Sequence, residues 1–398
     1  MKNLLFYLCF GLVLQASLFS QESDSLLSVY LERANSHIAL ERYASAHFTL
    51  DSALQRAAFR PELVCLMVDN VFQNYFQQED LTLFYLKNTQ REEGRNLTVI
   101  RHPDRMLQKL IKAYPESGYA YKLLGDFQRL SLREGIKNPL GNPEPTWVVR
   151  DRIYAYYSRA GQLGFRDTGM NRWMGEYFLA GERPAMAISY FEKNVFEEGG
   201  DPLSNFYLSR IYFADKKYSE AYSYALGAMK QDSMLALYQQ YEAARIAAQS
   251  FFFLGETNKF LSYTNKCLNL LPGKQDAYLD LIGYFANQLA DRRVEKLFRQ
   301  MLLENSYQFR GFEALEKHAL KTGNYDFAED LLETLLERFE YSDEALGHIY
   351  RCRGDLASQQ GNAGEARRFW DISRNYYYRF LPEDDPVFRQ IGQLDRLN

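Results

Sequence analysis

From Glu22 onward, apolar residues recur three and four positions apart, which is the spacing of an amphipathic α-helix. Residues 63–76 form one such stretch. Residues 102–114 form another, which begins at Pro103 and is followed by Pro115. Proline suits the first turn of a helix and stops the chain from continuing one, because it lacks an amide donor. The pattern therefore predicts an all-helical chain.

The helical pattern repeats itself along the chain. A small or apolar residue marks the same place in the second helix of six successive units, and the distances between these residues are 34, 39, 34, 34 and 38 positions. Self-similarity of this kind indicates a repeat architecture, in which each unit buries its apolar side against its neighbours. The marker residues, called anchors below, are Ala187, Ala221, Phe260, Val294, Ala328 and Ala366.

This repeat resembles the tetratricopeptide repeat (TPR), a family whose units are two antiparallel helices. In that family small residues lie where the helices cross, a glycine ends the first helix and a proline can end the second. Gly181, Gly255, Gly323 and Gly361 fit the glycine position, and Pro272 and Pro382 fit the proline position. The resemblance, which is to exported bacterial members, implies an all-α, right-handed superhelical solenoid of antiparallel helix pairs.

The clearest repeats cover residues 116–382, residues 21–115 hold degenerate helical repeats, and residues 383–398 form a C-terminal tail. Residues 133–146 interrupt one unit and cannot be helical throughout, because they contain three prolines and two glycines. Long loops are often functional, and a tolerated surface excursion is the alternative. The second helix of this unit is expected near Trp147, with core residues Ile153, Tyr157 and Ala160.

The two longer anchor distances imply four or five extra residues each. The first set is predicted at residues 232–241, where it lengthens one helix pair. The second is predicted at residues 336–344, as a polar link. Both are interpreted as surface adjustments.

The first twenty residues have the parts of a secretory signal peptide. Lys2 supplies a positive start, residues 4–14 form an apolar run, and small residues follow up to Ser20. The run is shorter than the roughly 20 residues that cross a bilayer. Cys9 is not preceded by the small residues of a lipoprotein box. We expect cleavage after Ser20 and an exported protein, periplasmic or outer-membrane-associated; an uncleaved anchor is the alternative.

Charge and chemistry-bearing residues exclude several function classes. The net charge is −4, with 47 basic and 51 acidic residues, which does not indicate a nucleic-acid binder. The five histidines lack zinc-site spacing, and no phosphate-binding glycine loop or nucleophile elbow is present. We therefore expect no cofactor, no metal and no catalytic residue. Cys65, Cys267 and Cys352 are far apart and are predicted to be buried, not disulfide-bonded.

Candidate binding residues come from the TPR resemblance, which implies that the first helices line a concave groove. Arginine can pair with a carboxylate through two parallel hydrogen bonds, and aromatic rings bury area at low entropy cost. A solvated helix face with scattered charge is the alternative for each residue. The lysine–asparagine clamp of chaperone-binding members is not matched, because Glu176 stands at one asparagine position. The candidates are Arg172, Glu176, Phe206, Arg210, Phe213, Arg245, Gln249, Phe252, Asn287 and Lys317, with Arg351 further along.

These expectations favour a non-enzymatic scaffold or adaptor in the bacterial cell envelope, which binds a peptide or protein segment in the concave groove. Its partners would be proteins or peptides, in an envelope or outer-membrane complex, and not nucleic acid. The alternative is an aromatic-rich α/α-toroid enzyme that acts on polysaccharide with two carboxylates about 5–10 Å apart. Against it, tryptophan occurs only three times, and the aromatic residues recur at core positions of the repeat.

Overall fold

The computed structural model describes residues 25–56, 59–78, 88–92, 95–99, 102–133, 144–196, 200–230 and 235–397. The predicted signal peptide, residues 1–20, and residues 134–143 of the predicted loop lie outside the described residues. The chain divides into two compact units, residues 1–190 (unit 1) and residues 191–398 (unit 2). Across the described parts, the structure contains no helix of the length and apolarity that a bilayer span requires.

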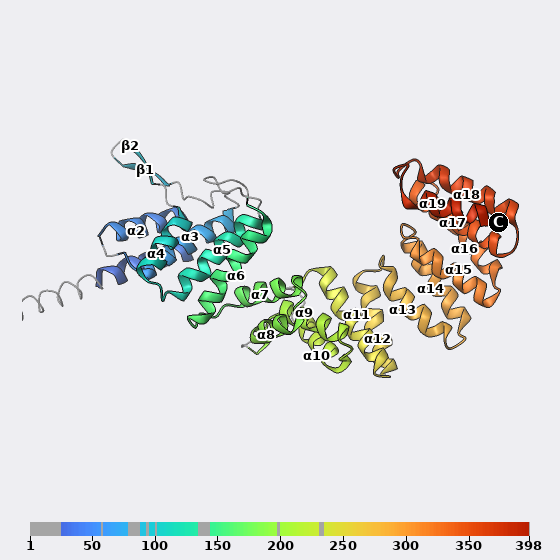
Figure 1. The fold of residues 1–398 in the computed structure, drawn as a ribbon, viewed down its shortest axis with the longest axis horizontal. Coiled ribbons are helices and arrows are strands. Elements are labelled where there is room, and N and C mark those ends of the chain that lie inside the picture. The colour runs from blue at the N-terminus through green and yellow to red at the C-terminus, as the bar shows by residue number, and fades with distance from the viewer. Residues whose placement is uncertain are drawn as a thin grey trace, which may run out of the picture. The chain divides into compact units, whose positions relative to one another are not determined.

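Unit 1 is built from packed helices (Figure 1). The helices predicted at residues 63–76 and 102–114 are confirmed by α3 and α4. The sequence did not predict the antiparallel hairpin, in which Asn88 pairs with Val99. The elements are a helix at residues 25–39, α2 (Tyr43–Arg56), α3 (Pro61–Gln78), β1 (Asn88–Glu92), β2 (Arg95–Val99), α4 (Pro103–Ala113), α5 (Gly118–Arg133), α6 (Thr146–Gln162) and α7 (Thr168–Ala180).

The predicted delayed helix is α6, and its predicted core residues Ile153, Tyr157 and Ala160 are buried. Gly125 of α5 faces the Tyr157 ring so closely that an added Cβ would lie 2.3 Å from Tyr157 Cε1. Only glycine lets the two helices approach this far, because any side chain would displace the ring. The Tyr157 hydroxyl donates a hydrogen bond to Asp126 Oδ1 at 2.6 Å, which satisfies the buried polar end of this ring.

Helix pairs continue through unit 2, where first helices alternate with second helices (Figure 1). Helix α8 (Pro184–Val195) crosses the boundary between the units. The first helices are α9 (Pro202–Ala214), α11 (Leu237–Phe253), α13 (Gln275–Ala286), α15 (Arg310–Thr322) and α17 (Asp343–Gln359). The second helices are α10 (Tyr218–Met229), α12 (Thr257–Leu270), α14 (Asp291–Glu304), α16 (Tyr325–Arg338) and α18 (Ala363–Tyr377), and α19 (Pro386–Leu397) follows.

The six anchors confirm the predicted repeat phase. Helix α8, which is the second helix of its pair with α7, and the second helices α10, α12, α14, α16 and α18 contribute one anchor each. All six anchors are buried, and none exceeds 2% exposure. A small residue at this place lets the axes of the paired helices approach closely.

A second residue recurs in the same phase, five positions before each anchor, in the turn from first to second helix. Its backbone lies in the left-handed region, which reverses the chain between the antiparallel helices. Three of these residues are glycines and three are not, so half of the turns place a side chain in a conformation that costs energy. They are Glu182 (φ 56°), Lys216 (59°), Gly255 (77°), Leu289 (54°), Gly323 (72°) and Gly361 (81°).

Two of the distances between anchors are longer than 34 positions, and the extra residues in them lie mainly in first helices. Helices α11 and α17 have 17 residues each, whereas α9, α13 and α15 have 12 or 13. Within the described part of residues 232–241, the predicted lengthening of a helix pair is confirmed by α11, which begins at Leu237; residues 232–234 lie outside the described residues. The polar link predicted at residues 336–344 is shorter than expected: α16 ends at Arg338 and α17 begins at Asp343, so residues 339–342 connect them and the extra residues lie in α17. Four residues make about one helical turn, so α17 extends without changing which side faces the core.

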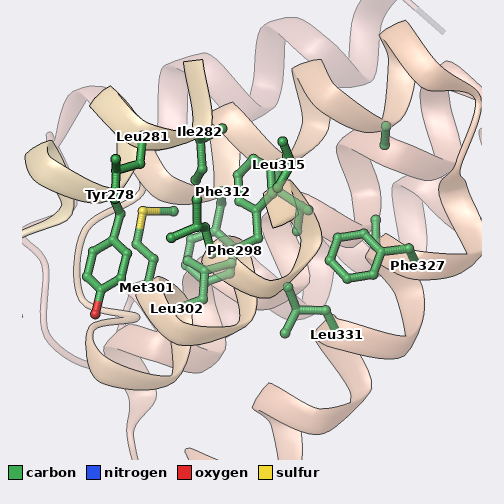
Figure 2. Close-up of a cluster of buried hydrophobic side chains, with 14 of the residues drawn as sticks. Tyr278, Leu281, Ile282, Phe298, Met301, Leu302, Phe312, Leu315, Phe327 and Leu331 are labelled. Atoms are coloured by element: carbon green, nitrogen blue, oxygen red, sulfur yellow. The ribbon is translucent and has the colours of Figure 1, made fainter. Parts of the chain in front are cut away.

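One apolar core runs through unit 2 from α10 to α17, and Figure 2 shows side chains of its part between α13 and α16. Phe298 of α14 and Phe312 of α15 are both fully buried at its centre. Burial of each such side chain contributes about 1.5–3 kcal/mol. Residues 383–398, which the sequence left outside the array, contain α19, and its Ile391 is fully buried against the last pair.

Candidate binding face on the first helices

Two predicted binding residues on α11 lie together and point toward α13. Arg245 and Gln249 are one helical turn apart, so they share a helix face. Arg245 Nε lies 3.0 Å from Asp280 Oδ2, and Gln249 Nε2 lies 3.2 Å from both oxygens of Asp280. Arg245 Nη1 is also 3.8 Å from Asp276 Oδ1. The predicted cation is therefore already paired within the chain.

Asp276 also receives a cation from the next repeat. Arg310 Nη1 on α15 donates to Asp276 Oδ1 at 2.5 Å. The carboxylates of α13 thus lie between an arginine of α11 and an arginine of α15. We call this set of five residues the first-helix ladder: Arg245, Gln249, Asp276, Asp280 and Arg310.

Electrostatics and burial compete at Arg245. Burial lowers the pKa of Arg245, but its hydrogen bond to Asp280 and the two aspartate charges outweigh that effect and raise the pKa. Arg245 and Asp280 each keep about a fifth of their side-chain surface exposed, at 22% and 21%. Such partly solvated pairs contribute about 1 kcal/mol or less, so the ladder aligns helices more than it stabilises them.

The remaining predicted residues of unit 2 are scattered along the first helices α9, α11, α13 and α15. Arg210 and Lys317 are exposed, and Asn287 is exposed at the end of α13. Phe252 is 45% exposed beside Phe253, and Phe213 is half-buried against Phe253.

The prediction that Phe206 lies on the binding face is wrong. This residue is only 4% exposed and packs with Ala228, Leu235 and Ala243 in the core. The apolar side of α9 is broad enough to include this position, so Phe206 turns inward. Arg210 lies over its ring, with the guanidinium carbon 5.7 Å from the ring centroid.

The other two candidates, Arg172 and Glu176, lie half-buried on α7 in unit 1. The first helices of unit 1 also carry a polar network. Lys122 Nζ lies 2.8 Å from Asp126 and 3.6 Å from Asp167, so it joins α5 to the start of α7. Paired charges between successive first helices therefore occur in both units.

Sequence reasoning missed three ladder residues, Asp276, Asp280 and Arg310. A pattern of outward cations and aromatic rings does not by itself show which carboxylates face them. A signal was present: Arg245 and Asp280 are 35 positions apart, and Asp276 and Arg310 are 34 apart. Opposite charges separated by about one repeat lie at equivalent positions of neighbouring first helices.

A second group of polar residues lies between α15 and α17. Glu316 of α15 is 9% exposed, and Cys352 of α17 is fully buried next to it. Asp355 accepts a hydrogen bond from Trp370 Nε1 at 2.8 Å. Arg351 lies with its guanidinium carbon 3.9 Å from the centroid of the Phe309 ring and donates to Gln390 at 3.2 Å.

The carboxyl groups of this second group have raised pKa values. Burial and the nearby Asp355 charge raise the pKa of Glu316 to about 8. Burial also raises the pKa of Asp355 to about 6, against the hydrogen bond from Trp370 and the charge of Arg351. A glycosidase would need such a pair to reach a sugar ring, but Oε1 of Glu316 is enclosed by protein. This arrangement does not suit the polysaccharide-enzyme alternative.

No group of three or more His, Cys, Asp or Glu side chains within the described parts of the chain is placed to hold a metal ion. The three cysteines after residue 20 that the structure describes, Cys65, Cys267 and Cys352, are buried and free, as predicted. Burial raises the pKa of Cys65 and that of Cys267 to about 12, so neither thiol is a ready nucleophile.

Comparison with known proteins gives structural likenesses only. The sequence matches no known family profile and no curated protein. Similar solved structures include PilF of Pseudomonas aeruginosa, with 13% identity, a TM-score of 0.44, and coverage of 66% of this chain and 99% of that chain. The C-terminal part of a TPR protein of Cytophaga hutchinsonii has 13% identity and a TM-score of 0.41, with 68% and 94% covered.

YrrB, a TPR protein with an unusual peptide-binding site, has 12% identity and a TM-score of 0.40, with 57% of this chain and 95% of that chain covered. The fold assignment itself rests on the helix pairs, the buried anchors and the left-handed turns described above. This chain has a TPR-like helical-repeat fold.

Proposed function

We propose that the protein is a non-enzymatic scaffold that docks a peptide or protein segment along the first helices of unit 2. The observation that carries the proposal is the first-helix ladder. It joins α11, α13 and α15 into one polar surface whose charged groups remain partly exposed. Exposed Phe252 and Lys317 flank it and offer apolar and cationic contacts.

Paired charges set the manner of docking. A partner carboxylate that approaches Arg245 has to replace Asp280, and a partner cation that approaches Asp280 has to replace Arg245. Such exchange gives selectivity more than affinity, because each new pair is offset by one that is lost. Affinity would come from surface that forms no ion pair within the chain. The exposed rings of Phe252 and Phe253 would be buried when the partner binds.

The proposed location is the bacterial cell envelope, as a periplasmic or outer-membrane-associated protein. Support comes from the signal-peptide pattern of residues 1–20. Mass spectrometry of the protein purified from its native cells tests this: a mature chain that begins at or near Gln21 is expected. An intact Met1 on cytoplasmic material would contradict export and leave the docking proposal standing.

Photo-crosslinking tests the docking face. A photoreactive phenylalanine analogue is placed at Arg210, Phe252 or Lys317 on first helices, and at exposed Lys296 or Glu333 on second helices as matched controls. We expect discrete adducts, containing the same partner, from the first-helix positions and none from the controls. Adducts of equal yield from both sets would contradict a dedicated face, and so would none from either.

A further inference from the structure

The contact between α15 and α17 encloses a carboxyl group that lacks a full set of partners. Glu316 is 9% exposed, and its Oε1 is buried without a hydrogen-bond partner among the described residues. The Cys352 thiol of α17 is hydrogen-bonded to this carboxyl group. A weak thiol donor compensates only a small part of what an ionised carboxylate loses when it leaves water.

The charged groups that face Glu316 are mostly of its own sign. Asp355 lies on α17 and Glu313 on α15, and both raise the pKa of Glu316. Arg351 of α17 is the facing cation among the described residues. Its Nε is 3.9 Å from Asp355 Oδ2.

One guanidinium thus faces three carboxyl groups, because the neighbouring Arg353 is paired with Glu329 of α16 at 3.1 Å. We call Glu313, Glu316, Arg351, Cys352 and Asp355 the carboxyl cluster.

We propose that α15 and α17 share a proton held on Glu316, and that their contact weakens when this proton is lost. A neutral Glu316 carries no net charge toward Asp355, and its hydroxyl can donate a hydrogen bond inside the contact. An ionised Glu316 leaves a buried negative oxygen without a partner beside a second carboxylate. The inference concerns unit 2 alone and does not depend on whether a partner docks.

The direction of the pH effect follows from the pKa values. The pKa of Glu316 rises from an ordinary value of 4.5 to about 8 in the folded chain. The folded state therefore binds this proton more tightly than the unfolded state does. Between these values the unfolded chain is deprotonated and the folded chain protonated, so stability falls as pH rises. Asp355 acts in the same direction at lower pH, because its pKa also rises. The contact is therefore stronger in mildly acidic than in mildly alkaline solution.

Hydrogen exchange of the full mature chain tests the proposal. Amide protection in α15 and α17 is measured at about pH 5.5 and about pH 8.5, after correction for the intrinsic rate. We expect it to fall by up to about tenfold per pH unit inside the window, for one proton. Protection in α11 and α12 is the internal reference and should change little.

Variants assign the effect to one carboxyl group. Glu316→Gln keeps the shape but cannot ionise, so the pH dependence of α15 and α17 should disappear. Glu313→Gln is the matched control, since Glu313 is exposed one turn earlier on the same helix, and it should keep most of that dependence.

A pH dependence in Glu316→Gln equal to that of the unmodified chain would overturn the proposal. So would flat protection in the unmodified chain, a result that needs no variant to fold. Trp370 fluorescence gives a second reading, because its indole nitrogen contacts Asp355.

Discussion

Leu289 adopts a backbone conformation that leucine disfavours, because the turn between the paired helices requires it. Its backbone is left-handed (φ 54°), and its side chain is 83% exposed, so it gains little from packing. Gly323 occupies the equivalent place one repeat later. The turn geometry is therefore imposed by the helix pair, and the residue type only sets what that geometry costs.

Replacing Leu289 by glycine should stabilise unit 2 by about 1 kcal/mol, because glycine adopts the left-handed region without strain. Gly323→Ala should destabilise by a similar amount. An added Cβ there has no atom within 4 Å, so only backbone strain would act. Urea unfolding of both variants measures the two changes, and equal midpoints would contradict this account.

The three buried cysteines should resist thiol reagents in the folded chain. Burial raises the pKa of Cys65 and of Cys267 to about 12 and raises that of Cys352 well above its ordinary value, so almost no thiolate exists near neutral pH. Reaction of a chain that begins at Gln21, and so lacks Cys9, with a chromogenic disulfide should release no colour until denaturant is added, and then three equivalents. Rapid reaction of any thiol without denaturant would show that its repeat opens locally.

At the scale of the element, close helix crossings depend on glycine facing an aromatic ring. An added Cβ on Gly354 of α17 would lie 2.4 Å from Trp370 Cδ1 of α18. The ring is fully buried and cannot move away without opening the core. The glycine of one helix and the ring of the next thus set the spacing of the pair.

Gly354→Ala should therefore destabilise the last helix pair by about 1–3 kcal/mol, which is typical of overpacking. Gly364→Ala is the matched control on α18. An added Cβ there meets nothing within 4 Å, and alanine favours helix over glycine by about 1 kcal/mol. Thermal unfolding should move in opposite directions for the two variants. A loss of stability in both would mean that crowding at Trp370 is not the cause.

Elements were predictable from the sequence where periodicity and stop signals agreed. Pro103 and Pro115 bracket α4, and Ile153 and Tyr157 fall on the buried side of α6. The hairpin escaped prediction because β1, with the sequence NTQRE, has no apolar residue to show a period of two. A helix lengthened by a whole turn keeps its phase, so the pattern alone did not distinguish the longer α17 from a link.

At the scale of the whole molecule, each unit is held by contacts between neighbouring repeats. The apolar core of unit 2 and the first-helix ladder both run from one helix to the next. The candidate helices of this face were predictable from the TPR pattern. Which side chains meet there was not, because a pattern of outward positions does not say that Asp280 neutralises Arg245.

A double-mutant cycle measures how strongly the ladder joins α11 to α13. Arg245→Ala, Asp280→Ala and the double variant should give a coupling of about 0.5–1 kcal/mol, since both groups are only partly exposed. Arg299 and Asp330 on second helices form the control pair. They are 40% and 65% exposed and should couple more weakly. Equal coupling energies for the ladder pair and the control pair would contradict a specific role of the ladder in aligning the repeats.

The constant interval of five residues between each left-handed residue and its anchor has a consequence for how such a chain can grow. The two longer repeats, which contain α11 and α17, keep this interval unchanged, and their extra residues lie mainly in the first helix. Further whole turns could enter at the same places while the reversals stay intact. One residue inserted between Gly323 and Ala328 would rotate α16 by about 100° and present its polar flank to the interior.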